Sequence, residues 1–189
     1  MEAVTGCGDM NGAAPQPAVA VFGSNDAREG DAAYETARSV GRKLAELGYA
    51  VANGGYGGTM EASARGAKEA GGRTIGVTCS LWREAANAYI DETIVTDSLM
   101  QRVAKLVELG LAGYVVLPGA TGTLVELAVV WEQMAKGLMS RRPLVCVGNF
   151  WRPIMKLMAQ AKPGSEGLVS VVPGADELER FFPPVQVFN

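Results

Sequence analysis

Short apolar runs alternate with amphipathic segments of helical length from Ala18 onward, and this alternation restricts the possible folds more than any other feature. The most apolar runs lie at 18–22, 49–52 and 114–117. Segments with apolar residues at helical spacing follow them, at 31–47, after the loop 53–58, and at 123–136. The pattern predicts a doubly wound, mostly parallel α/β sheet of the Rossmann-like type, with helices on both faces.

The same periodicity predicts the remaining elements and the core-facing side chains. Residues 73–78, 93–95, 143–147 and 168–172 are expected to be strands, 79–92 an irregular excursion, and 97–110, 153–160 and 176–181 helices. Leu99, Val103, Leu106 and either Val107 or Leu109 are expected to face the core from one helix. Leu124, Leu127, Ala128, Trp131 and either Met134 or Ala135 are expected to do so from the next.

Length and composition predict a single domain. The 189 residues are 48% hydrophobic and 20% charged, which suffices for one well-filled core but not for two large domains. Residues 1–16 are small, polar and rich in glycine and proline, so we expect a flexible N-terminal tail before a domain at 17–185.

Composition also excludes several classes of function. The net charge is −3 and the only adjacent basic pair is Arg141-Arg142, so nucleic acid is not expected as a partner. No run is apolar for the roughly 18 residues of a membrane helix, which predicts a cytoplasmic protein without a membrane partner. There is no histidine, and the three cysteines are far apart, so a metal site, a disulfide framework and a histidine-based triad are not expected. No cofactor is expected either.

Two glycine-rich turns stand between a predicted strand and a predicted helix. In the turn from Pro118 through Gly119, Ala120, Thr121 and Gly122 to Thr123, helix N-terminal N–H groups and two hydroxyls could hold a phosphate. The second turn carries Gly54, Gly55, Gly57 and Gly58, and it could face the same crevice. The alternative is that the glycines only make tight turns. Neither turn is a dinucleotide fingerprint or a P-loop.

Glu126 and Arg102 are the leading candidates for charged residues that take part in a reaction. Glu126 is expected in the first turn of the helix that follows the phosphate turn, and a carboxylate beside a phosphate requires a nearby cation. Arg102 is the leading cation, near the start of the preceding helix. The alternatives are a first-turn glutamate that complements the helix dipole and a solvated surface arginine.

Residues 118–126 resemble the P-G-G-x-G-T-x-x-E hallmark of the Lonely Guy phosphoribohydrolases, long mislabelled lysine decarboxylases. The resemblance extends over most of 18–180 and includes a Gly23-Ser24 turn and a glycine loop ending at Met60. It implies a homodimer that binds an AMP-like nucleoside 5′-monophosphate and hydrolyses its N-glycosidic bond. Arg102 and Glu126 would be catalytic, and the ligand would be bound by Gly23, Ser24, Met60 and the two glycine-rich turns.

The chain departs from the family pattern at three places. Ala120 replaces the second motif glycine, and Met100-Gln101-Arg102-Val103 stands where cytokinin-activating members have Met-His-x-Arg-Lys. The glycine loop is also about one residue shorter than the usual form of the family. Some relatives keep the fold but bind or carry a cofactor, such as molybdenum cofactor, without hydrolysing a nucleotide. Such a binding protein is therefore the alternative function. Lysine decarboxylation is rejected because no lysine lies in the glycine-rich turns to hold pyridoxal phosphate.

Overall fold

The computed structural model describes residues 16–186, and within them the chain forms one seven-stranded sheet. The order is β4-β3-β2-β1-β5-β6-β7, and every pairing is parallel, which confirms the predicted doubly wound α/β architecture. The strands are β1 (Ala18–Phe22), β2 (Ala50–Asn53), β3 (Thr74–Cys79), β4 (Glu92–Thr96), β5 (Gly113–Val116), β6 (Leu144–Val147) and β7 (Ser170–Val172). The predicted tail at 1–16 lies outside the described residues, except for Gln16.

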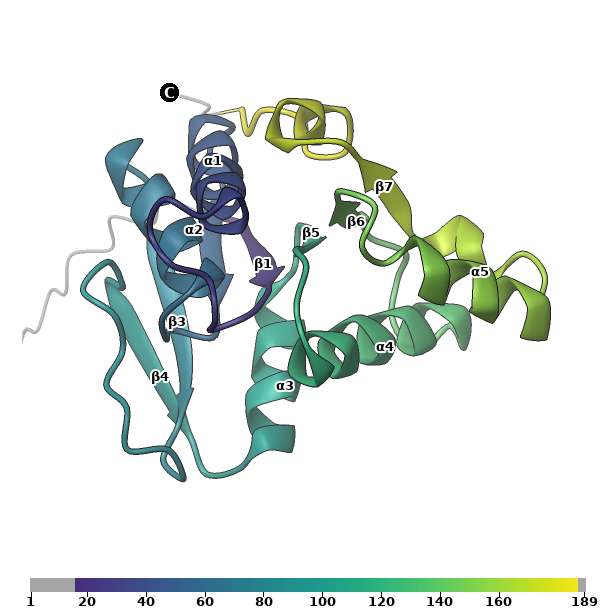
Figure 1. Cartoon of the computed structure of the whole chain (residues 1–189), viewed down its shortest axis with the longest axis horizontal. Helices are drawn as coiled ribbons and strands as arrows, with labels where there is room; N and C mark the ends of the chain where they lie inside the picture. The colour runs from purple at the N-terminus through teal and green to yellow at the C-terminus, as the bar shows by residue number, and fades with distance from the viewer. Residues whose placement is uncertain (1–15, 187–189) are drawn as a thin grey trace, which may run out of the picture.

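Helices cover both faces of this sheet (Figure 1). The α-helices are α1 (Ala32–Glu46), α2 (Thr59–Glu69), α3 (Leu99–Leu109), α4 (Thr121–Ala135) and α5 (Arg152–Ala161), with 3₁₀ helices η1 (Ser165–Leu168) and η2 (Ala175–Arg180). Helices α1 and α2 lie side by side at one side of the molecule, and α3 and α4 lie at the other. Within the described part of the chain, no helix is long and apolar enough to cross a membrane.

The alternation of side chains along the strands produces two cores. In β1, Val19 and Val21 pack against α1, whereas Ala20 and Phe22 point to the opposite face and join α3 and α4. Strand β5 repeats the division, with Val115 on the first face and Tyr114 on the second. Every residue of β1 and β5 is buried, as expected for central strands of a parallel sheet.

The structure corrects several details of the predictions. Leu99 is 43% exposed because it is the first residue of α3, and the core face begins at Arg102 and Val103. Ala128 is also exposed and lies on the outer side of α4. The predicted strand at 168–172 begins only at Ser170, because the chain before it forms η1. The predicted last helix is the 3₁₀ helix η2 rather than an α-helix.

The strand order determines where a ligand can bind. Strands β2, β3 and β4 extend the sheet on one side of β1, and β5, β6 and β7 extend it on the other. The direction of winding therefore reverses between β1 and β5. In sheets of this type, a crevice opens at such a switch point, outside the carboxyl ends of the strands.

Candidate functional site

A cleft of about 400 Å³ lies at this switch point. Its walls come from the segments that follow β1, β2 and β3 and from α3 and α4, and they include both polar and apolar side chains. The lining residues are Val21, Phe22, Gly23, Ser24, Asn25, Asp26, Gly54, Tyr56, Met60, Trp82, Glu84, Arg102, Ala120, Gly122, Thr123 and Glu126.

The predicted phosphate turn places the N-terminus of α4 at the cleft. Ala120 precedes the helix and no side chain caps it, so its first amide N–H groups lack the partners that a cap would supply. Gly119 packs so closely on Thr123 that a Cβ would collide with its side chain. Ala120 has φ −92° and ψ −157°, a backbone conformation that alanine adopts without strain. The replacement of the motif glycine by Ala120 therefore leaves the turn intact.

The glycine loop after β2 meets the same cleft through only part of its length. Asn53 holds it: its Nδ2 donates to the carbonyl of Met60 at 2.9 Å, and its Oδ1 accepts from the Gly55 amide at 2.8 Å. Gly54 and Met60 line the cleft. Gly58, by contrast, packs against the backbone of the segment after β1.

Several residues predicted to bind the ligand lie beside the cleft rather than in its wall. These are Gly55, Gly57, Gly58, Pro118, Gly119 and Thr121. Gly55 and Gly58 have φ of +78° and +65°, a conformation that favours glycine, so these two residues permit the turn itself. Gly23 and Ser24 do line the cleft, and a Cβ at Gly23 would collide with Thr59.

Arg102 is buried rather than on the surface of α3, with only 7% of the residue exposed. Its Nε donates to the carbonyl of Val77 at 2.7 Å, and one terminal nitrogen donates to the carbonyl of Gly54 at 3.0 Å. A Cβ at Gly54 would overlap this guanidinium, so glycine is required there. The hydrogen bonds orient Arg102 toward the cleft from the first turn of α3, which begins after the capping residue Ser98.

Glu126 faces Arg102 across the cleft, and it too is 7% exposed. Its Oε1 lies 3.7 Å from the second terminal nitrogen of the guanidinium. Burial raises the pKa of Glu126 to about 7, although the positive charge of Arg102 acts in the opposite direction. Burial likewise lowers the pKa of Arg102, while Glu126 opposes that shift. The Glu126 carboxyl is thus able to hold or release a proton near neutral pH.

A family model described as the SLOG cluster4 family matches residues 16–167. The chain belongs to this family. An uncharacterized protein of Archaeoglobus fulgidus is 32% identical to it over 69% of this chain and 83% of that protein. A cytokinin riboside 5′-monophosphate phosphoribohydrolase of Mycobacterium tuberculosis is 36% identical, over 60% of this chain and 61% of that protein. The matches confirm the resemblance to the Lonely Guy phosphoribohydrolases, and this chain spans about three fifths of the length of its mycobacterial relative.

Solved structures share the fold of this SLOG cluster4 chain. The molybdenum cofactor binding protein of Rippkaea orientalis superposes with a TM-score of 0.72 at 23% identity, over 87% of this chain and 94% of that protein. The molybdenum cofactor carrier protein of Chlamydomonas reinhardtii has a TM-score of 0.66 at 26% identity, over 85% and 92% of the two chains. The Rossmann-like architecture is therefore common to proteins that are named for different functions.

The sequence predictions missed seven residues that line the cleft of this SLOG cluster4 member: Val21, Phe22, Asn25, Asp26, Tyr56, Trp82 and Glu84. Val21 and Phe22 were predicted only as strand residues, Asn25 follows the Gly23-Ser24 turn, and Tyr56 lies within the glycine loop. Trp82 and Glu84 belong to the irregular segment after β3, which carried no motif. A signal was present, because a segment that follows a parallel strand starts at the ligand-binding edge of the sheet. Among residues 16–186, no three histidine, cysteine or acidic side chains gather closely enough to hold a metal ion.

Proposed function

We propose that this protein is a nucleoside 5′-monophosphate phosphoribohydrolase that acts on an AMP-like substrate and releases the free base and ribose 5-phosphate. The observation that carries the proposal is the buried pair of Arg102 and Glu126, placed in the wall of the cleft one helical turn from the N-terminus of α4. The mycobacterial relatives named cytokinin riboside 5′-monophosphate phosphoribohydrolase support the same reaction.

The N-terminus of α4 is proposed to bind the 5′-phosphate. Its uncapped amide groups and the positive end of the helix dipole favour an anion, and Gly122 and Thr123 form that part of the cleft wall. Because Glu126 follows on the same helix, a phosphate held there brings the ribose near its carboxyl group. Binding at the phosphate then positions the glycosidic bond.

Glu126 is proposed to assist the attack of water on C1′ of the ribose. In its carboxylate form it accepts a proton from the water as the oxygen bonds to C1′, while the C1′–N bond breaks and its electrons leave with the base. The departing base takes up a proton from solvent, and Glu126 returns its own proton to solvent afterwards, so the products are the neutral base and ribose 5-phosphate. The carboxylate also stabilises the positive charge that develops on the sugar. Arg102 holds Glu126, and its second terminal nitrogen remains directed toward the carboxylate and the ligand.

A product assay tests the proposal. We expect the purified protein to release adenine and ribose 5-phosphate from AMP in equal amounts, measured by chromatography and a coupled sugar-phosphate assay. Adenosine is the matched control, because it has the same glycosidic bond but no phosphate to position it. Binding of AMP without release of ribose 5-phosphate would contradict a hydrolase. Equally fast cleavage of adenosine would contradict the role given to α4.

A non-catalytic binding protein is the second proposal, favoured by a different observation. The carrier protein of Chlamydomonas reinhardtii covers 85% of this chain at 26% identity, and it is named as a carrier of molybdenum cofactor. The cofactor shares a phosphate and a planar ring system with a nucleotide, so the same cleft suits both. If the protein binds molybdenum cofactor from a cofactor-containing extract and hydrolyses no nucleoside monophosphate, the result would favour this alternative.

We also propose that the protein is a homodimer that uses the outer face of α4. An apolar hollow of about 450 Å³ lies between α4 and α5, and no residue of α5 is buried in the described chain. Its apolar walls are formed by Leu124, Leu127, Ala128, Trp131, Ala135, Ile154, Met158 and Ala161. An exposed apolar surface of this kind is typical of an interface, and the homodimer implied by the family resemblance supplies a second copy as its occupant.

Ala128→Glu is expected to convert the dimer to a monomer, because it places a charge in this apolar face. Size-exclusion chromatography with light scattering measures the mass in solution. Ala104→Glu is the matched control, since Ala104 is exposed on α3, away from the hollow. A wild-type protein that is monomeric at micromolar concentration, or an A128E variant that stays dimeric, would contradict the proposed interface.

A further inference from the structure

Trp82 differs from the other two tryptophans of the chain in its exposure. Trp131 and Trp151 are buried, whereas Trp82 is 41% exposed and lines the cleft. An indole that stays open to water in a ligand-binding cleft keeps a large apolar surface available for a ligand. The mechanism proposed above gives Trp82 no part in the reaction.

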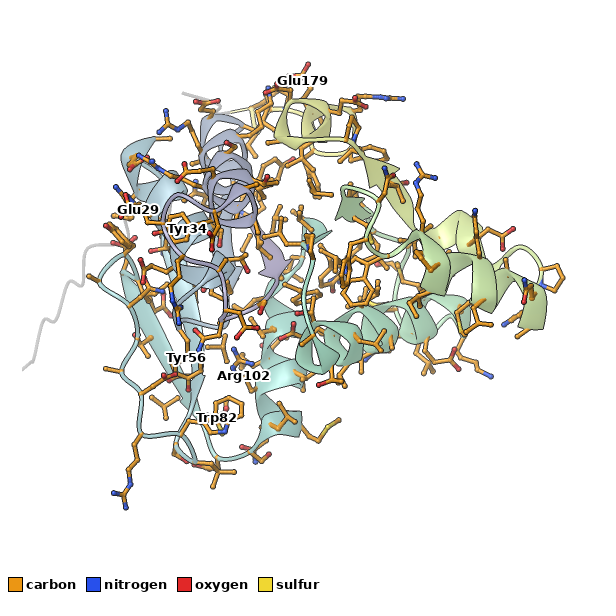
Figure 2. The ribbon with its side chains drawn as sticks, viewed as in Figure 1. Glu29, Tyr34, Tyr56, Trp82, Arg102 and Glu179 are labelled. Carbon is orange, nitrogen blue, oxygen red and sulfur yellow. The ribbon has the colours of Figure 1, made fainter. Side chains whose placement is uncertain are left out.

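Neighbouring groups hold the indole in one orientation. Its ring packs edge-to-face on Tyr56, with centroids 5.7 Å apart, and the guanidinium of Arg102 lies 5.4 Å from the centroids of both rings. Figure 2 shows Tyr56, Arg102 and Trp82 close together. The segment that carries Trp82 is attached to the glycine loop by Asn87, whose Nδ2 donates to the carbonyls of Gly55 and Tyr56 at 3.0 and 2.8 Å. Trp82 is therefore a prearranged surface.

The order of groups along the cleft indicates which part of a ligand the indole of Trp82 would contact. The N-terminus of α4 forms part of the cleft wall, Glu126 lies one helical turn further along that helix, and Arg102 contacts Glu126 on one side and the indole of Trp82 on the other. An anion site, a carboxylate with its arginine and an aromatic ring thus follow one another. A nucleoside monophosphate presents its phosphate, ribose and base in the same order.

We propose that Trp82 is the base-stacking residue of this cleft and a determinant of its specificity for ligands with a planar base. The inference rests on the proposed nucleotide ligand but not on its hydrolysis. Every nucleobase has a flat π-face, and stacking on an aromatic side chain stabilises it without hydrogen bonds. The indole supplies this contact, while the phosphate determines how far along the cleft the base reaches.

Comparison of AMP with ribose 5-phosphate isolates the contribution of the base. Calorimetric titration of Trp82→Ala is expected to show AMP binding weakened by about 5-fold to 100-fold, the range of base–aromatic stacking, with ribose 5-phosphate binding unchanged. Trp82→Phe, which keeps an aromatic ring, restores most of the AMP affinity. Leu81→Ala is the matched control, because Leu81 is exposed in the same segment and does not line the cleft. If the wild type turns over AMP during titration, all variants are compared in a Glu126→Gln background.

Intrinsic fluorescence gives a second readout that a merely structural role would not change. AMP is expected to quench the wild-type emission, and Trp82→Phe is expected to bind AMP without that quench, because Trp131 and Trp151 are buried and do not line the cleft. Equal weakening of AMP and ribose 5-phosphate by Trp82→Ala, or no weakening of either, would overturn the inference. A wild type that binds AMP but does not hydrolyse it contradicts the proposed hydrolase and leaves the stacking inference standing. If the wild type hydrolyses AMP and Trp82→Ala does so with an unchanged KM, the result contradicts the stacking inference and leaves the proposed hydrolase standing.

Discussion

Replacement of Glu126 by glutamine is expected to lower the release of ribose 5-phosphate from AMP by about 10²-fold to 10⁴-fold, the usual contribution of a positioned acid–base group. Glutamine has nearly the same shape but neither accepts the proton of the attacking water nor carries the charge that stabilises the developing cation. The loss should fall on kcat, with the KM for AMP little changed, because the phosphate and base contacts remain. Steady-state assays of released ribose 5-phosphate measure both constants.

Glu108→Gln is the matched control for this variant. Glu108 lies on α3, is exposed and forms an i,i+3 ion pair with Lys105 at 2.7 Å, so its replacement should leave the rate unchanged. Activity in E126Q close to that of wild type would remove Glu126 from the mechanism. Similar losses in both variants would point to a general effect on the fold rather than to the carboxyl group in the cleft.

The stability of E126Q also depends on pH in a defined direction. The folded protein keeps the Glu126 proton to about pH 7, whereas the unfolded chain releases it near the ordinary pKa of 4.5. The stabilising contribution of this group is therefore complete below pH 4.5 and is lost as the pH rises to 7. Across that window the free energy of unfolding of E126Q should rise relative to wild type by up to about 3 kcal/mol. Urea denaturation at pH 4.5 and 7.5 measures the difference.

Local patterns were sufficient to predict the fold. The apolar strands and the helices that follow them are continuous stretches of sequence, so their spacing predicts both the element type and the parallel sheet. The errors lie where a tertiary relation decides. Leu99 fits the apolar stripe of α3, but it is the first residue of the helix and is 43% exposed. Ala128 fits the stripe of α4, but it lies on the side that faces the open hollow near α5.

The cleft was predictable only where its residues lie close together in the sequence. Ala120, Gly122, Thr123 and Glu126 lie in one short motif, and the structure places all of them at the cleft. The contact between Arg102 and Gly54 joins positions 48 residues apart, and only folding shows why glycine is needed there. The indole of Trp82 comes from a segment without periodicity, and its position depends on Tyr56 and Arg102. No local pattern predicts such a cluster.

Replacement of Arg102 by alanine is expected to remove activity and to lower stability by roughly 3–5 kcal/mol at pH 8, as for a buried ion pair that loses one partner. The carbonyls of Val77 and Gly54 would lose their donors, and the ionised Glu126 would be buried without its counter-charge. At pH 5 the cost should be smaller, because Glu126 is then protonated and needs no counter-charge. Urea denaturation at both pH values measures the free energy of unfolding of R102A relative to wild type. Arg42→Ala is the control: it removes a more exposed ion pair with Glu69 and should lower stability by under about 1 kcal/mol.

The double variant R102A/E126Q separates the two causes of this loss. If the desolvation of an unpaired buried charge dominates, the second substitution should restore about 1–3 kcal/mol at pH 8, and the double variant should be more stable than R102A alone. If the two carbonyls dominate, the two losses should simply add. Additive losses, with no dependence of the R102A cost on pH, would mean that Arg102 and Glu126 do not interact. The same result would remove the basis for assigning Arg102 the task of holding the carboxylate against the ribose.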